Sequence, residues 1–126
     1  MDRHEFEAIL LREYDAICDY PWKDDPTDEV FRHADTRKWF ALVMELPRKR
    51  LGIGGDETVT AVNLKCDPRL IGTLRGRPGL YPAYHMNKEH WITATLDGSL
   101  PDEELLWLAD MSYEITKAKK KPSSQK

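Results

Sequence analysis

The sequence has 126 residues, of which 40% are hydrophobic and 33% are charged. This length and composition predict one globular, soluble domain and exclude a mostly disordered chain. A run of about 18 apolar residues, which a transmembrane helix needs, does not occur. The net charge is −3, but residues 1–31 carry −7 and residues 32–90 carry +5. This balance argues against strong nonspecific DNA binding, yet it leaves a local basic surface as an alternative.

The first residues carry acids where a secretory signal needs bases, and the two cysteines are Cys18 and Cys66. We therefore expect a cytoplasmic protein with both thiols reduced. The cysteines form no CxxC motif and have no histidines at zinc-site spacing, so we expect no metal and no cofactor. We also expect a monomer without membrane contact.

The first predicted element is a helix over residues 2–18. Asp2 and Glu5 have the spacing of a capping box at its start. Pro21 and Pro26 follow and end it. Apolar residues recur at helical spacing and predict the buried stripe: Phe6, Ile9, Leu10, Ile17 and Cys18.

Strands are predicted next. Residues 29–34 are short and alternating, and residues 38–46 are apolar on both faces, as in a central strand. Residues 47–57 are predicted to hold a short strand followed by a glycine-rich hairpin turn, and residues 58–66 are rich in β-formers. The short turns between these segments favour an antiparallel meander.

A second helix is predicted over residues 66–76, where Asp67 is the N-cap and Pro68 the first helical residue. Residues 77–87 are predicted to be a loop because they contain two prolines and a glycine. Residues 90–96 predict a strand with two faces. Its core side and then its outward side hold these residues: Ile92, Ala94 and Leu96; Trp91, Thr93 and Thr95.

The last predicted helix follows a turn at residues 97–101, where Ser99 and Asp102 have capping-box spacing. The order of elements is therefore helix, four strands, helix, strand and helix. We predict an α+β two-layer sandwich, with an antiparallel sheet of about five strands and the helices on one face. This domain covers residues 1–119, and the basic tail 120–126 is predicted to be disordered.

Histidines and carboxylates give weak signals of chemistry. His85 and His90 are five apart, a spacing that suits neither a helical nor a strand metal pair. Cys66 beside a helix start is either a reactive thiol or a small buried residue. The acids of the first helix either bind a hard cation weakly or are solvated: Glu5, Glu7, Glu13, Asp15 and Asp19. We assign no catalytic residue.

Basic and aromatic residues in the middle of the chain give the strongest signal. Cations beside an exposed aromatic ring are typical of nucleic-acid or anion contacts. The alternative is that the cations are solvated and Trp91 packs across the strands. The candidate residues for such contacts are Lys38, Arg48, Lys49, Arg50, Lys65, His85, Asn87, Lys88, His90 and Trp91.

Six segments spread over residues 1–119 share a pattern with one protein family: YPW at 20–22, VFRH at 30–33, KWFALVM at 38–44, NLKCDP at 63–68, PAYHMNKEHW at 82–91 and LDGSLPDEELLWLADMSYE at 96–114. They resemble the signature segments of the MmcQ/YjbR family. The resemblance implies a fold like that of CyaY, the bacterial frataxin homologue. It also implies DNA binding through two β-hairpin wings, an activity inferred from the shape of the family.

The resemblance implies that the family's recurring polar positions correspond to Lys38, Lys65, His85, Asn87, Lys88, His90 and Trp91. The segment 45–61 lengthens one hairpin relative to compact members and adds three consecutive basic residues at 48–50. Our first functional hypothesis is therefore a DNA-binding module that uses this hairpin. The expectation rests on the charge layout and on the resemblance together.

Two other hypotheses use different residues. One is a site for a small anionic ligand, formed by Lys65, Tyr84, His85, Asn87, Lys88 and Trp91. The other is frataxin-like metal binding by the acidic first helix, which rests on an analogy of fold alone. No set of nucleophile, base and orienting group is evident, so we do not expect an enzyme.

Overall fold

The computed structural model describes residues 1–118, and these contain three α-helices, one short 3-10 helix and six strands. In chain order the elements are α1 (Arg3–Tyr14), β1 (Ile17–Asp19), β2 (Glu29–Arg32), β3 (Trp39–Pro47), η1 (Arg48–Leu51), β4 (Thr58–Lys65), α2 (Pro68–Leu74), β5 (Leu80–Pro82), β6 (Trp91–Thr95) and α3 (Asp102–Thr116). The predicted tail at 120–126 lies outside the described residues. Within residues 1–118 no helix is long and apolar enough to cross a membrane.

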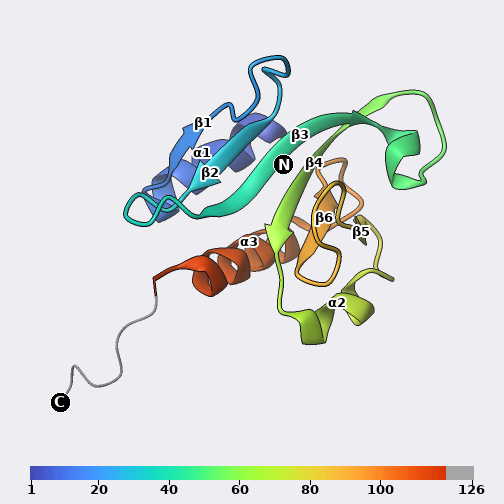
Figure 1. Ribbon diagram of the computed structural model, residues 1–126. Coiled ribbons are helices and arrows are strands. Elements are labelled where there is room, and N and C mark those ends of the chain that lie inside the picture. Colours follow the sequence, from blue (N-terminus) through green and yellow to red (C-terminus); the bar gives the residue numbers. More distant parts are fainter. Residues whose placement is uncertain (119–126) are drawn as a thin grey trace.

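The six strands form one antiparallel sheet in the order β1-β2-β3-β4-β6-β5 (Figure 1). The long central strands fix the register, with Ala41 opposite Leu64 and Leu64 opposite Ile92. Because side chains alternate along each strand, these three residues share one face of the sheet. The predicted α+β class with an antiparallel sheet is confirmed.

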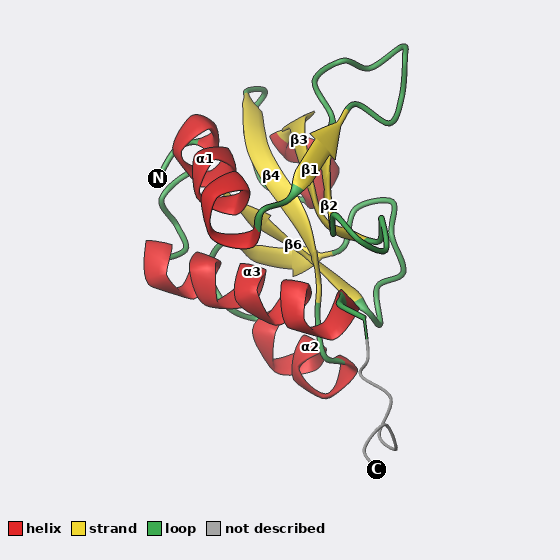
Figure 2. Ribbon diagram, turned by 90° about the vertical axis from the view of Figure 1, so that its left-hand side faces the viewer, coloured by secondary structure: helices red, strands yellow, loops and turns green. Residues whose placement is uncertain are grey.

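All three helices contribute to the core on that face. Figure 2 shows α1 and α3 against the same side of the sheet, with α2 near one end of it. Burying such an apolar face supplies most of the driving force for folding. The core on the helix side contains Phe6, Leu10, Phe31, Phe40, Val43, Val62, Leu64, Ile71, Leu74, Ile92, Ala94, Leu105 and Leu108.

Among residues 1–118 no α-helix covers the opposite face of the sheet, which carries a smaller cluster of buried residues. Val30, Leu42, Met44, Leu46 and Ala61 form this second cluster. Leu51 of η1 and Tyr84 of the loop before β6 pack against it. We call this side the open face.

The predicted end of the first helix is wrong. The capping box of Asp2 and Glu5 is present, but α1 stops at Tyr14 because Asp15 adopts a left-handed backbone with φ of 50°. Cys18, predicted on the helical stripe, lies instead in β1, opposite Phe31. Hydrophobic spacing alone could not distinguish the three residues of β1, Ile17–Asp19, from a further helical turn.

Three further predictions need correction. The segment predicted as a short strand after residue 46 contains η1 and adds no separate strand. The predicted loop 77–87 contains β5, which together with β1 gives the sheet six strands instead of about five. Ser99 does not cap α3, because its hydroxyl donates to Asp97 Oδ1 at 2.5 Å and Pro101 occupies the N-cap. The caps predicted for α2 are confirmed, with Asp67 accepting from Arg69 N.

A β-bulge at Phe40 positions the residues at the start of β3. Phe31 lies opposite Ala41, whereas Arg32 lies opposite Trp39, so Phe40 is an extra residue in the pairing. A bulge places two successive side chains on roughly the same side. Phe40 and Ala41 accordingly both belong to the helix-side core, and Trp39 is left on the open face.

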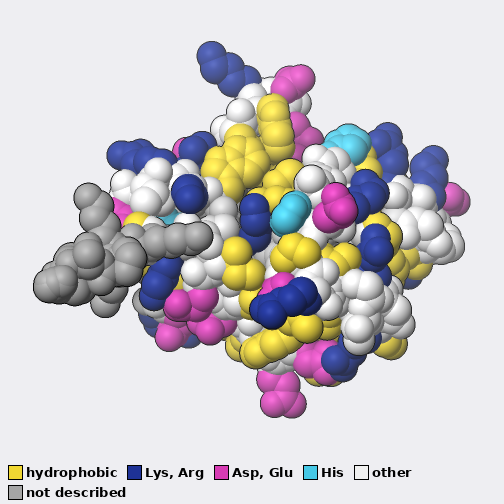
Figure 3. Space-filling view, turned by 60° about the horizontal axis from the view of Figure 1, so that its bottom comes forward, with side chains coloured by type: hydrophobic (Ala, Val, Ile, Leu, Met, Phe, Trp, Pro, Cys, Tyr) yellow, Lys and Arg dark blue, Asp and Glu magenta, His cyan; other side chains and the backbone are white. Residues whose placement is uncertain are grey.

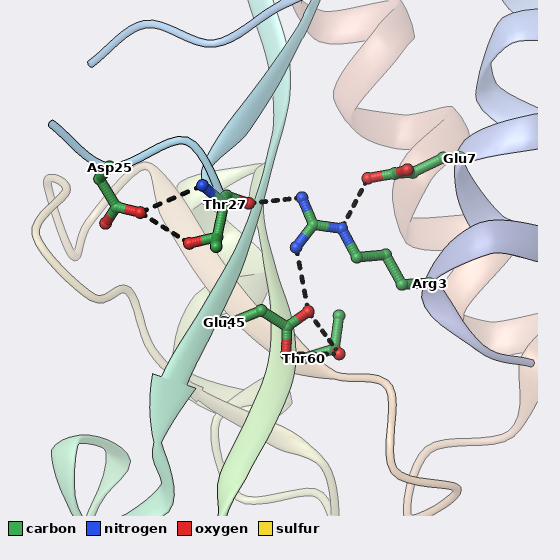
Figure 4. A network of polar contacts seen from close by, with 6 residues as sticks. All are labelled: Arg3, Glu7, Asp25, Thr27, Glu45 and Thr60. Atoms are coloured by element: carbon green, nitrogen blue, oxygen red, sulfur yellow. Dashed lines mark hydrogen bonds and ion pairs between the residues drawn. The ribbon is translucent and has the colours of Figure 1, made fainter. Parts of the chain in front are cut away.

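A polar network ties α1 to the sheet (Figure 4). The Arg3 guanidinium donates to Glu7 at 2.8 Å, to Glu45 at 3.0 Å and to the Thr27 carbonyl at 2.5 Å. The Thr60 hydroxyl donates to Glu45 from the neighbouring strand at 2.8 Å. Partial burial raises the pKa of Glu7 above its usual value, although the ion pair with Arg3 opposes this effect.

Candidate functional site

A surface pocket of about 400 Å³ lies where β3 starts, β4 ends and β6 starts. Because neighbouring strands are antiparallel, these three positions meet at the same end of the sheet. We call it the Lys38–Lys65 pocket. It is lined by Lys38, Trp39, Lys65, Met86, Trp91, Ile115 and Thr116.

A tight turn between β2 and β3 places Lys38 and Trp39. The His33 N–H donates to the Lys38 carbonyl at 2.9 Å, and the Arg37 N–H donates to the His33 carbonyl at 3.0 Å. Arg37 has a left-handed backbone with φ of 68°, which closes the turn. Lys38 therefore leaves the sheet at its end, with an exposed side chain.

Ser112 of α3 fixes the position of Lys65. Its hydroxyl accepts from the Lys65 N–H at 2.8 Å and donates to the Phe40 carbonyl at 2.5 Å. One buried hydroxyl thus satisfies the bulge of β3 and the end of β4 together. The Lys65 ammonium lies 5.4 Å from the centre of the Trp91 ring, within the range of a cation–π contact.

Contacts on the open face brace Trp39 at the other wall of the pocket. The Arg32 guanidinium lies 5.6 Å from the centre of the Trp39 ring, and the Trp22 ring meets it edge-on at 6.0 Å. Arg32 also donates to Asp19 at 3.2 Å. Its Nε atom is buried without a hydrogen-bond partner among the described residues.

His33 lies behind the pocket, next to Thr116. Its Nε2 lies 2.7 Å from the Thr116 hydroxyl, which itself donates to the Ser112 carbonyl at 2.7 Å. Because a hydroxyl has one hydrogen to donate, His33 Nε2 is the donor to Thr116. Burial lowers the pKa of His33; nearby Asp35 opposes this effect, and Lys38 adds to it.

The loop before β6 forms the side of the pocket on the open face. Asn63 holds this loop, since its amide donates to the Tyr84 carbonyl at 2.9 Å and its oxygen accepts from Thr93. The Thr93 hydroxyl in turn accepts from the Tyr84 N–H at 2.9 Å. His85 has a left-handed backbone with φ of 58°, and its ring stacks on Tyr84 at 3.9 Å. Met86 then lines the pocket.

The electrostatic character of the pocket is positive. Of the described residues that line it, two are lysines and none is acidic. Within residues 1–118 neither Lys38 nor Lys65 forms an ion pair, although nine ion pairs occur elsewhere in this part of the chain. On the side of the molecule drawn in Figure 3, Lys and Arg side chains lie among exposed hydrophobic ones.

The structure brings together only some of the predicted site residues. Lys38, Lys65 and Trp91 share the pocket. Lys88 lines a separate depression over α2, beside Glu89. The Asn87 side chain accepts from the Glu89 N–H at 2.7 Å and forms the turn before β6. The predicted cluster at 84–91 is therefore divided between different surfaces.

His90 and His85 are also outside this pocket. The carbonyl of His90 accepts from the Cys66 N–H at 2.8 Å and extends the pairing of β4 and β6. The His85 ring lies beside Arg50 and two aspartates, Asp25 and Asp28, in a smaller pocket. The His90 backbone therefore contributes to strand pairing, and the His85 ring contributes a stacking contact with Tyr84.

The three basic residues of the lengthened hairpin have different environments. Arg48 donates to the Gly54 carbonyl at 3.1 Å and pairs with Asp97 at 3.4 Å. Arg50 donates to the Tyr84 hydroxyl at 2.7 Å. Lys49 is exposed. Part of the predicted basic tip is therefore engaged within the molecule.

Neither the cysteines nor the acids of α1 form a recognisable reactive or metal site. Burial raises the pKa of the Cys66 thiol to about 11, and partial desolvation with the neighbouring Glu29 raises the pKa of the more exposed Cys18 thiol to about 11. A thiol with a raised pKa is a poor nucleophile. Within residues 1–118 no group of three or more His, Cys, Asp or Glu side chains is placed to hold a metal ion.

Sequence reasoning missed four residues of the pocket: Trp39, Met86, Ile115 and Thr116. Trp39 had a usable signal, because it follows Lys38 directly at the start of a strand. The bulge that turns Trp39 toward the open face has no such signal. Ile115 and Thr116 come from α3 and reach the pocket only through packing of the helix on the sheet.

Comparisons with known proteins agree with this description. A family model described as YjbR matches residues 11–115. The uncharacterized protein YyaQ of Bacillus subtilis is 36% identical over 117 residues, which cover 93% of this chain and 99% of YyaQ. The uncharacterized protein YjbR of Escherichia coli K12 is 46% identical over 76 residues, which cover 60% of this chain and 56% of YjbR.

Solved structures share the fold. A crystal structure of a Pseudomonas syringae protein has a TM-score of 0.90 at 46% identity, covering 93% of this chain and 100% of that chain. A Deinococcus radiodurans protein has a TM-score of 0.67 at 29% identity, covering 92% of this chain and 83% of that chain.

Proposed function

The chain belongs to the YjbR family, and we propose that it is a binding protein for a small anionic ligand held in the Lys38–Lys65 pocket. The observation that supports this function is the pairing of two lysines, without a carboxylate partner among the described residues, in one concave site. An anion in this position would gain charge-assisted contacts from both ammonium groups.

The shape of the site supports a small ligand. Its volume of about 400 Å³ falls in the lower part of the range for small-molecule pockets, about 300–1,000 Å³. Ser112 and the cation–π contact with Trp91 hold Lys65 in place before any ligand arrives. Such preorganisation reduces the entropy lost on binding.

Ribose 5-phosphate is a suitable first probe, because it is a small anion that fits this volume. We expect calorimetry at low salt to show binding that weakens as salt is added. Replacing either lysine, in Lys38→Ala or Lys65→Ala, removes a charge-assisted contact and should weaken binding about tenfold or more. Lys49→Ala removes the same charge from an exposed position outside the pocket and serves as the matched control.

Two results would contradict this function. One is no binding of the probe by the wild-type protein at low salt. The other is a loss of affinity in Lys49→Ala as large as that in Lys65→Ala, since the effect would then come from net charge and not from the pocket.

DNA binding through the lengthened hairpin is a second candidate. In Figure 1 the connection between β3 and β4 extends beyond the rest of the sheet, and η1 holds three consecutive basic residues, Arg48–Arg50. Asp97 offsets the charge of Arg48, which weakens this candidate. Fluorescence anisotropy with a labelled duplex tests it: Lys49→Ala combined with Arg50→Ala should weaken binding, and Lys65→Ala should not.

A further inference from the structure

We propose that the ligand of the Lys38–Lys65 pocket carries a flat aromatic ring beside its anionic group, as a nucleoside 5′-phosphate does. This inference rests on the proposed anion-binding function and specifies its substrate class. It comes from the two tryptophans that line the pocket together with the lysines, Trp39 and Trp91. A site for a bare anion does not need two indole rings.

The two tryptophans come from strands separated by one other strand. Trp39 starts β3 and Trp91 starts β6, with β4 and Lys65 between them. Neighbouring strands are about 4.8 Å apart, so the two backbones are separated by roughly 10 Å. An aromatic ring packs about 3.5–4.0 Å from its neighbour. The Lys65 side chain lies within this separation, so a ring would stack on one of the two tryptophans and would not be sandwiched between them.

Both tryptophan rings are held by contacts that leave them partly exposed. Arg32 and Trp22 brace Trp39, and the Lys65 ammonium lies over Trp91. Met86 adds a polarizable side chain on the same pocket, and methionine sulfur makes favourable contacts with aromatic rings. The walls therefore suit a ring, and the lysine ammonium groups suit the phosphate attached to it.

The experiment compares probes that separate ring from phosphate: adenosine 5′-monophosphate, ribose 5-phosphate and adenosine. Stacking of a base on an aromatic side chain contributes roughly five- to 160-fold in affinity. We expect adenosine 5′-monophosphate to bind at least about fivefold more tightly than ribose 5-phosphate. Equal affinity of these two probes would overturn this inference and leave the anion-binding function standing.

A different result would overturn the proposed function itself. If adenosine bound as tightly as adenosine 5′-monophosphate, the phosphate would contribute nothing, and the lysines would have no anion to hold. No binding of any phosphate-bearing probe would overturn both proposals together. The two failures are therefore distinguishable in a single titration series.

Variants of the two tryptophans test which of them contacts the ring of the ligand. At least one of Trp91→Leu and Trp39→Leu should lower the affinity for adenosine 5′-monophosphate toward that for ribose 5-phosphate, and that variant identifies the tryptophan on which the ring stacks. Trp107→Leu is the matched control, because Trp107 is also exposed but lies on α3 outside this pocket. Thermal melting checks that each variant folds. If Trp39→Leu does not fold, the decision rests on Trp91→Leu and on quenching of tryptophan fluorescence by each probe in the wild-type protein.

A final arm distinguishes two sources of the same chemistry. A single-stranded octamer of deoxyadenylate is titrated with and without a 5′-phosphate. Binding of the free mononucleotide alone assigns the site to a small metabolite. Tighter binding of the phosphorylated octamer assigns it to the end of a strand, and both results support the ring-and-phosphate chemistry. Tighter binding of the unphosphorylated octamer contradicts it.

Discussion

Arg3 and Lys65 are both basic side chains that lie against the sheet, on opposite faces and in opposite surroundings. Arg3 has two carboxylates and a carbonyl within hydrogen-bond distance, and its side chain is only 22% exposed. Lys65 lies over an aromatic ring and has no carboxylate partner within residues 1–118. The first cation is neutralised and joins a helix to the sheet. The second keeps its charge available, so pairing is more informative about function than the count of basic residues.

Removing Arg3 should have the largest effect on stability. Arg3→Met leaves Glu7 and Glu45 as partly buried carboxylates without their cation, and we expect a loss of about 2 kcal/mol in the free energy of unfolding. Urea denaturation measures this loss. The affinity for ribose 5-phosphate should stay within about twofold, because Arg3 lies on the other face of the sheet. If Arg3→Met were as stable as the wild type but bound ribose 5-phosphate more weakly, Arg3 would serve binding and not folding, which contradicts the contrast with Lys65.

Removing the Ser112 hydroxyl should have the next largest effect on stability, and it should also lower the affinity for the anion. Ser112→Ala leaves the Lys65 N–H and the Phe40 carbonyl without their buried partner, which should cost about 1–2 kcal/mol in the free energy of unfolding. Because the same hydroxyl positions Lys65, affinity for the anion should fall as well. Ser112→Thr keeps a hydroxyl and should restore part of both. Unchanged affinity in the alanine variant would separate the position of Lys65 from Ser112.

The effect of pH on the free energy of unfolding should be smaller, and we expect it to come from His33. Its pKa is lowered in the folded state, so below the ordinary value of about 6.5 the unfolded state takes up a proton first. The contribution of neutral His33 is therefore complete above about 6.5 and decreases as the pH falls from there toward the lowered pKa. Denaturation of wild type and His33→Gln across this range measures it. Equal pH dependence in both proteins would exclude His33 as the source.

Lys65 should have the smallest effect on stability. Lys65→Met keeps most of the apolar side chain and removes a charge that has no carboxylate partner among the described residues, so the free energy of unfolding should change by less than about 0.5 kcal/mol. Binding of ribose 5-phosphate should nevertheless fall, which sharpens the contrast with Arg3→Met. A large loss of stability would mean that Lys65 contributes to folding as Arg3 does.

Much of the fold was predictable, because local signals and tertiary packing agree. Asp2 and Asp67 cap their helices as expected, and the long strands β3 and β4 carry strong β-forming sequences. The short strands β1 and β5 were missed. Each has three residues, and pairing with a neighbour defines it more than its own sequence does.

The candidate site was predictable in its residue types and not in its grouping. Lys38, Lys65 and Trp91 were singled out and do share a pocket. His85, Lys88 and their neighbours were grouped with them because they are close in sequence. The left-handed backbone at His85 and the turn at Asn87 separate these side chains in space, and neither feature is encoded by a glycine.

The bulge at Phe40 has a consequence for comparing this chain with its relatives. In an uninterrupted strand, alternation would send the Phe40 ring to the open face and Trp39 into the helix-side core. In a relative with a different number of residues between His33 and Ala41, an aligned tryptophan therefore does not by itself show that the ring lies on the open face. An alignment gap of one residue there can pair two tryptophans that occupy different faces of the sheet. The number of residues between His33 and Ala41 therefore decides whether a tryptophan at this position can line the pocket.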